Sequence, residues 1–293
     1  MSNTNNPLSG HFRTPKLYTS LPTGGKFYDD TIVDMPSTNE LPVYPMTAKD
    51  EIMMKNPDAL LNGEAVAQVI SSCVPNVKQP RLLVANDVDA LLVAIQGATF
   101  GDELTVSANC PTCGEQASAV LSTEVVLANM DNIDKKYEFS TDSGLLISMK
   151  PFSYETSVKA GVANFRSERS LQSISEIDDE IEKIRAFNSN FIELAKLNFD
   201  ILVDSVNSIT VPGSEDSESV VVTDKAHISE FLENCDATIG KELEEFVTEM
   251  GNKGIQKVMQ MTCEPCSEKL EGDEEFTFES AVNFNTVNFF TAS

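Results

Sequence analysis

The chain has 293 residues, which suffices for two domains of ordinary size or for one domain with a large insertion. Hydrophobic residues make up 41% of it, so a packed core is expected and disorder throughout is excluded. Lys and Arg number 21 against 46 Asp and Glu, a net charge of −25. A chain this acidic repels phosphate groups, so nucleic acid and anionic membranes are poor partners.

The sequence contains no apolar run near the 18 to 20 residues that a membrane-spanning helix needs, and no membrane partner is expected. Its first ten residues are polar and show no signal peptide, so we expect the chain to stay in a reducing cytoplasm. There, six cysteines are better interpreted as metal ligands or core residues than as disulfides. Cys73 and Cys235 lie on apolar helix faces, which predicts core positions for both.

Residues 1–45 are expected to form an extended N-terminal arm. Frequent prolines exclude a long helix, and Gly24–Gly25 predicts a turn. Aromatic residues and leucines are interspersed, so the arm should pack on a surface, either of its own protein or of a partner.

Residues 46–103 are expected to form a small helical region. Thr47 and Asn56 are predicted to cap two helices, and either Asn86 or Asp87 a third helix that stops at Gly97.

A split β domain is predicted for residues 104–153 together with 252–293, with a hairpin over 136–154 and strands over 275–290. The helical insertion between its halves covers residues 154–251 and begins with a long helical stretch at about 154–208. Apolar residues step along this stretch by three, four or seven and predict a seam for a second helix: Leu171, Ile174, Ile177, Ile181, Ile184, Phe191 and Leu194. Bundle cores use the same pattern, so we expect that helix to come from the same chain.

Two Cys-x-x-Cys elements carry the chemistry. Cys110 and Cys113 form the first pair, and Cys263 and Cys266 the second. Cysteines three apart in a tight turn can place both thiolates on one metal ion. The 149 residues between the pairs (114–262) far exceed a compact four-cysteine spacing, but an inserted domain explains them. We therefore predict one closed, structural Zn²⁺ site, with a redox role or idle thiols as alternatives. The second pair lacks a following glycine, so its turn is expected to be less ideal.

Enzymatic patterns are missing. His227 and Glu230 do not have the spacing of a zinc deaminase, and the glycines before Lys26 do not form a phosphate-binding loop. We expect no catalytic residue and no small-molecule substrate.

Several segments resemble the baseplate hub proteins of T4-like contractile-tailed bacteriophages. They are Leu21–Tyr28, Tyr44–Glu51, Asn56–Gly63, Cys73–Asn76, Asp87–Gln96 and the first cysteine pair. The resemblance covers roughly residues 15–125. It implies a non-enzymatic role in building the central hub of the tail baseplate, with other hub and tail proteins as partners. It also implies a location in the host cytoplasm during assembly. Two outcomes then stay open: the chain remains in the virion tail baseplate, or it leaves as an assembly chaperone.

The sequence thus predicts an α+β protein, mostly helical, with a small β zinc-ribbon-like element split by a long helical insertion. One alternative is an unrecognised hydrolase, which would need a pocket with a perturbed base that the sequence does not reveal. The other is a zinc-ribbon regulator that binds a host polymerase or nucleic acid. The net charge of −25 disfavours nucleic acid as its target.

Overall fold

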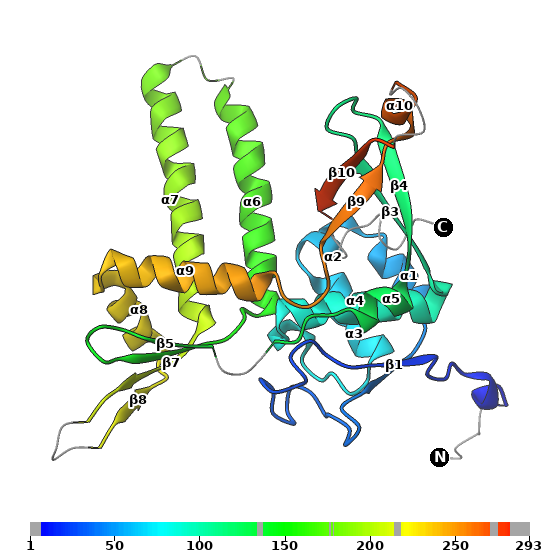
Figure 1. Cartoon of the computed structure of the whole chain (residues 1–293), viewed down its shortest axis with the longest axis horizontal. Coiled ribbons are helices and arrows are strands. Elements are labelled where there is room, and N and C mark those ends of the chain that lie inside the picture. The colour runs from blue at the N-terminus through cyan, green and yellow to red at the C-terminus, as the bar shows by residue number, and fades with distance from the viewer. Residues whose placement is uncertain are drawn as a thin grey trace, which may run out of the picture.

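The computed structural model describes residues 7–133, 137–175, 177, 179–213, 218–269 and 275–281. They form an α+β protein, as predicted (Figure 1). The helices are η1 (Ser9–His11), α1 (Ala48–Met54), α2 (Pro57–Leu61), α3 (Glu64–Cys73), η2 (Pro80–Leu82), α4 (Ala85–Phe100), α5 (Thr123–Ala128), α6 (Tyr154–Ser175), α7 (Glu180–Ser205), α8 (Lys225–Asn234), α9 (Ala237–Gly251) and α10 (Glu264–Ser267). The strands are β1 (Leu17–Thr19), β2 (Leu41–Val43), β3 (Glu103–Asn109), β4 (Gln116–Ser122), β5 (Tyr137–Ser140), β6 (Leu146–Met149), β7 (Val206–Val211), β8 (Val220–Val222), β9 (Val258–Thr262) and β10 (Thr277–Ala281).

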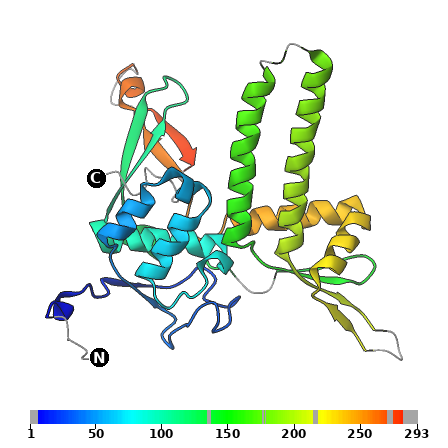
Figure 2. The ribbon, with the colours of Figure 1, turned by 180° about the vertical axis from the view of Figure 1, so that it is seen from behind.

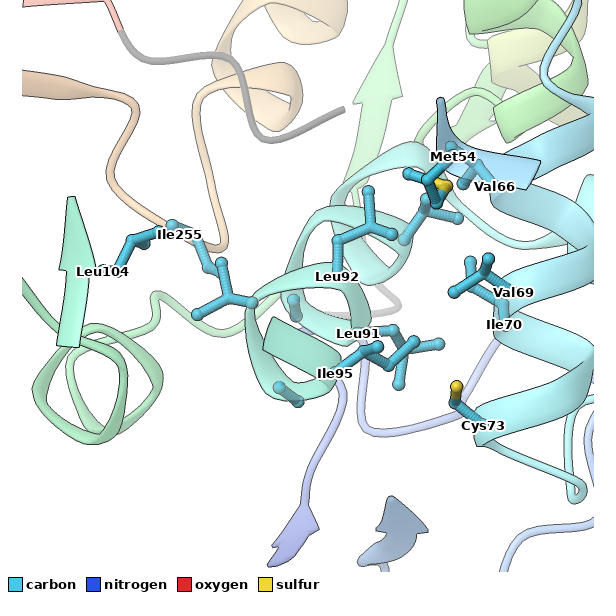
Figure 3. Packing of buried hydrophobic residues seen from close by; sticks show 14 of the residues in the cluster. Met54, Val66, Val69, Ile70, Cys73, Leu91, Leu92, Ile95, Leu104 and Ile255 are labelled. Carbon is cyan, nitrogen blue, oxygen red and sulfur yellow. The ribbon is translucent and has the colours of Figure 1, made fainter. Parts of the chain in front are cut away.

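Helix α4 is the centre of the larger hydrophobic core. Most of its side chains are buried on every side, because other elements cover it all round. Leu91, Leu92 and Ile95 lie among Val69 and Ile70 of α3 (Figure 3). The same core extends to the cysteine-bearing strands through Leu104 and Ile255. The body and the candidate metal site are therefore one packed unit.

The local capping signals of the first two helices are confirmed. Thr47 caps α1 in a reciprocal capping box with Asp50, and the Asn56 side chain accepts hydrogen bonds from the first turn of α2. Cys73 is fully buried at the end of α3, as predicted, and Cys235 is half-buried behind α8.

The predicted limits of the third helix are wrong at both ends. It begins at Ala85, so Asn86 and Asp87 are not its caps but buried side chains of its first turn, with distant partners. It also runs past Gly97 to Phe100. A Cβ at position 97 would lie 2.7 Å from Oγ1 of Thr123, so this glycine lets α5 approach the helix closely and does not end it.

The N-terminal segment packs on the helices of its own chain. Strands β1 and β2 pair antiparallel, and Leu21, Val33 and Leu41 are buried in the main core. Thr23 and Tyr28 reach Asp87 of α4: the backbone N–H of Thr23 donates at 3.0 Å and its hydroxyl at 2.6 Å, and the Tyr28 hydroxyl donates as well. The sequence predicts that the arm packs either on its own protein or on a partner. In the structure it packs on its own protein.

A second, smaller hydrophobic core lies among residues 137–250 and includes strands that precede the insertion. The predicted hairpin over 136–154 forms as β5 and β6, with Gly144 at φ 83° in its turn. Its strands pair with β7 and β8 in a four-stranded sheet of order β5–β6–β7–β8. Helices α7, α8 and α9 pack on that sheet around Ile147, Val206 and Ile228. The domain limits drawn from the sequence stay a prediction.

The predicted helical stretch at about 154–208 forms two helices, α6 and α7. Asp179 caps a new helix by accepting hydrogen bonds from the backbone N–H groups of Ile181 and Glu182. Helices α6 and α7 then lie side by side as a hairpin that stands away from the rest of the molecule (Figures 1 and 2).

Within the part of the chain that the structure describes, no helix is both long and apolar enough to cross a bilayer. The predicted strand residues beyond 281 lie outside the described residues.

Candidate metal centre

Two β-hairpins bring the four cysteines together. Strands β3 and β4 pair in register from Glu103–Ser122 to Asn109–Gln116, and their connection holds Cys110 and Cys113. Strands β9 and β10 pair likewise, and Cys263 and Cys266 follow directly after β9. Strand β4 contacts β9, so the two cysteine turns meet at one end of the paired hairpins, near α10 in Figure 1.

The sulfur atoms have the spacing of a tetrahedral site. All four lie within 4.8 Å of one another. Sγ of Cys110 is 3.8 Å from Sγ of Cys266, and Sγ of Cys113 is 3.5 Å from Sγ of Cys263. Four thiolates at about 2.3 Å from one Zn²⁺ would have their sulfurs about 3.8 Å apart. A disulfide needs about 2.05 Å, so these cysteines are free thiols. The donor set therefore fits a single ion of the zinc type.

The first cysteine turn is closed by backbone hydrogen bonds. The N–H of Cys110 donates to the carbonyl of Glu115 at 2.8 Å, and the N–H of Gly114 donates to that of Cys110 at 2.9 Å. Gly114 has φ 78°, a conformation that other residues rarely adopt. A glycine after the second cysteine of the pair therefore lets this turn close without strain.

The second cysteine turn is helical and is held by a side-chain hydroxyl. Residues 264–267 form the short helix α10. None of the described residues directly after Cys266, 267–269, has a left-handed backbone, so the missing glycine leaves no strained position there. The hydroxyl of Ser267 donates to the carbonyl of Cys263 at 2.8 Å and accepts from the N–H of Phe276 at 2.8 Å. Ser267 thus ties the cysteine turn to the segment that enters β10.

Sequence reasoning missed Ser267. The sequence Cys-Glu-Pro-Cys-Ser does indicate a compact helical turn, because proline is favoured in the first turn of a helix. The serine stands directly after the last cysteine of that turn.

The thiols differ in acidity. Burial raises the pKa of Cys110, but hydrogen bonds from the backbone N–H groups of Cys113 and Thr112 outweigh it and bring that pKa down to about 6. Burial, together with the neighbouring thiols, raises the pKa of Cys266 to about 12. One thiolate therefore forms readily, whereas four adjacent thiolates require a cation between them.

The other sulfur and imidazole groups lie elsewhere. Burial raises the pKa of the Cys73 thiol to about 11, as expected for an inert core residue. His11 and His227 are exposed, and neither belongs to a cluster that could hold a metal among the described residues.

Fold and site together define a class: an α+β protein in which a Cys₄ cluster joins two hairpins across a long insertion. A family model described as T4 bacteriophage base plate protein matches residues 27–284. The chain belongs to this family, so it is a phage baseplate protein that acts together with other tail proteins. No curated protein and no solved structure matches it.

Proposed function

We propose that this chain is a structural assembly protein of the baseplate hub, held together by one Zn²⁺ on Cys110, Cys113, Cys263 and Cys266. The observation that carries the proposal is the cysteine cluster. It lies within the residues that match the family, and it brings together two hairpins that are far apart in sequence. Closed four-thiolate sites contribute folding free energy directly.

The ion would act as a permanent cross-link and not as a reaction centre. Four protein ligands leave no coordination position for a substrate or water. Three of the four cysteines are buried, and only Cys113 is partly exposed. The role proposed is therefore non-enzymatic.

The hub role rests on the resemblance of residues 15–125 to hub proteins, within the broader baseplate family. The partners would be other hub and tail proteins, met in the host cytoplasm during assembly. The net charge of −25 suits partners with basic surfaces and disfavours the alternative of a regulator that binds nucleic acid.

Quantitative mass spectrometry of infected cells tests the role. Hub intermediates, peripheral baseplate parts and purified virions are compared for their content of this chain. Enrichment in hub intermediates supports the proposal, whether or not the chain persists in virions. Enrichment in peripheral parts alone contradicts the hub assignment.

Cysteine substitutions in the phage test whether the metal is needed for assembly. Cys110→Ser with Cys263→Ser should block baseplate formation, whereas Cys235→Ser, a thiol outside the cluster, should leave it intact. Normal assembly in the double variant would contradict a structural metal.

A further inference from the structure

The outer face of α7 is an apolar surface that nothing among the described residues covers. Five large side chains on it are more than half exposed: Ile181 at 65%, Ile184 at 57%, Phe187 at 53%, Phe191 at 66% and Ile192 at 66%. We call this set the α7 stripe. At about 100 Å² for each side chain it exposes on the order of 500 Å², which is large for the surface of a monomer.

Helix α6 packs against the other side of α7. The half-buried residues of α7 recur at Ala186, Asn190, Leu194 and Leu197. Asn190 donates to the hydroxyl of Ser167 on α6 at 2.9 Å, which fixes that face as the contact. The prediction that a helix of this chain covers Ile181, Ile184 and Phe191 is therefore wrong, because α6 uses the opposite face.

Three residues of the stripe, Ile181, Ile184 and Phe191, have the heptad spacing of a coiled coil. Together with other exposed residues they form a seam with intervals of three and four along the helix: Ile181, Ile184, Asn188, Phe191, Ala195 and Asn198. Phe187 and Ile192 of the stripe flank this seam, next to Asn188 and Phe191. A seven-residue repeat of this kind keeps one seam facing a partner helix. Figures 1 and 2 show the hairpin standing clear of the body and apart from α10, so another chain can reach it.

We propose that the α7 stripe binds the α7 stripe of a second copy of this chain, with the two helices parallel. The inference goes beyond the proposed function and does not depend on the metal. In a parallel coiled coil, charged residues that flank the core positions pair between the two helices. The residue just before the first core position of a heptad, here Ile181, faces the residue five places further along on the partner helix. This rule sets Glu180 opposite Arg185 of the second copy, and Arg185 opposite its Glu180.

The seam contains two asparagines, Asn188 and Asn198. Asn188 occupies the same heptad position as Ile181, where a single asparagine specifies register in parallel two-stranded coiled coils. Asn198 occupies the other core position, that of Ile184.

Charge and area also suit a second copy. Residues 159–200 carry six Lys and Arg against eight Asp and Glu, a net of −2, so most of the charge of −25 lies elsewhere. Two copies can thus approach through this region with little repulsion. The stripe supplies a large part of the roughly 800 Å² that each partner buries in a standard interface.

Sedimentation of the full chain with its metal tests the proposal. The wild type should have twice the 32.0 kDa mass of one chain at micromolar concentration. Ile184→Glu with Phe191→Glu should give single chains with unchanged circular dichroism, because both side chains are exposed. Ile52→Glu with Val120→Glu alters residues exposed by 71% and 64% on other surfaces and should leave the mass doubled. A wild type of one chain at all concentrations, or an assembly that the α7 variant leaves intact, overturns the proposal.

A charge exchange tests the parallel direction. Arg185→Glu places two glutamates opposite each other and should raise the dissociation constant about tenfold. Adding Glu180→Arg to it restores opposite charges and should restore the wild-type constant. A double variant as weak as Arg185→Glu would overturn the parallel arrangement.

Discussion

The side-chain amide of Asn86 lies 2.7 Å from the carbonyl oxygen of Lys253. The same nitrogen is 3.1 Å from the carbonyl of Met250 and 3.3 Å from that of Gly251. One side chain in the first turn of α4 thus holds the C-terminal end of α9, where the chain returns from the insertion to the cysteine hairpins. This contact joins the two cores.

Asn86→Ala should lower the free energy of unfolding by about 1–3 kcal/mol, because it removes the donor to the part-buried carbonyls of Gly251 and Lys253. Hydrogen exchange should lose protection first around residues 250–258. Asn129→Ala is the matched control: its amide donates to the carbonyl of Val125 at an exposed position, so the change should cost less than about 1 kcal/mol. Equal effects of the two variants would show that Asn86 does not join the cores.

Asp87 makes stability depend on pH. Burial raises its pKa to about 6, although Thr23 and Tyr28 donate hydrogen bonds that lower it. The folded state therefore binds the proton more tightly than the unfolded state. Stability due to this group is full below about pH 4 and is lost as pH rises through about 6, a loss of about 3 kcal/mol.

Urea unfolding of the wild type and of Asp87→Asn between pH 4 and 7.5 measures this effect. The carboxylates elsewhere titrate in both proteins, so the difference between the two curves isolates Asp87. As pH rises, the free energy of unfolding of the wild type should fall relative to that of Asp87→Asn. Parallel curves would mean that the pKa of Asp87 is ordinary.

Gly97→Ala should destabilise the protein despite the better helix propensity of alanine. The new Cβ would lie 2.7 Å from Oγ1 of Thr123, which also donates to Asp102 at 3.0 Å. A cost of about 1–3 kcal/mol in thermal or urea unfolding is expected from overpacking. Gly161→Ala in α6 is the control, since nothing lies near its Cβ, and it should stabilise by about 0.5–1 kcal/mol. A stabilising Gly97→Ala would contradict close packing of α4 on α5.

Ser267→Ala should weaken zinc binding about tenfold, because groups that orient metal ligands typically have effects of this size. The variant removes the bond to the Cys263 carbonyl and the acceptor for the Phe276 N–H. Competition with a chromogenic chelator measures it. Ser107→Ala on β3 removes a surface bond to Ser118 in the same hairpin pair and should have no effect. Equal affinities for all three proteins would exclude a role for Ser267 in the site.

Local signals predicted local structure well. Thr47 and Asn56 form their caps within three residues, so the sequence around them contains the whole interaction. Cysteines three apart likewise indicate a turn from spacing alone. Asn86 and Asp87 looked like caps for the same reason, but their partners lie at residues 250–253 and at Thr23 and Tyr28, which only the folded chain brings near.

The helical hairpin shows the opposite limit. The sequence revealed the apolar seam on α7 but not which face α6 would cover. The contact with α6 includes Ser167, which accepts a hydrogen bond from Asn190, and hydrophobic periodicity takes no account of such small polar residues.

Native mass spectrometry of the chain, purified without chelator, tests the central claim most directly. The wild type should carry one zinc ion per chain, and Cys110→Ser with Cys263→Ser should carry none, while Cys235→Ser keeps its ion. Removing zinc from the wild type should also deprotect residues 103–122, 258–269 and 275–281 in hydrogen exchange before it affects α6–α9. A wild type without zinc, or a double variant that retains it fully, would contradict the account.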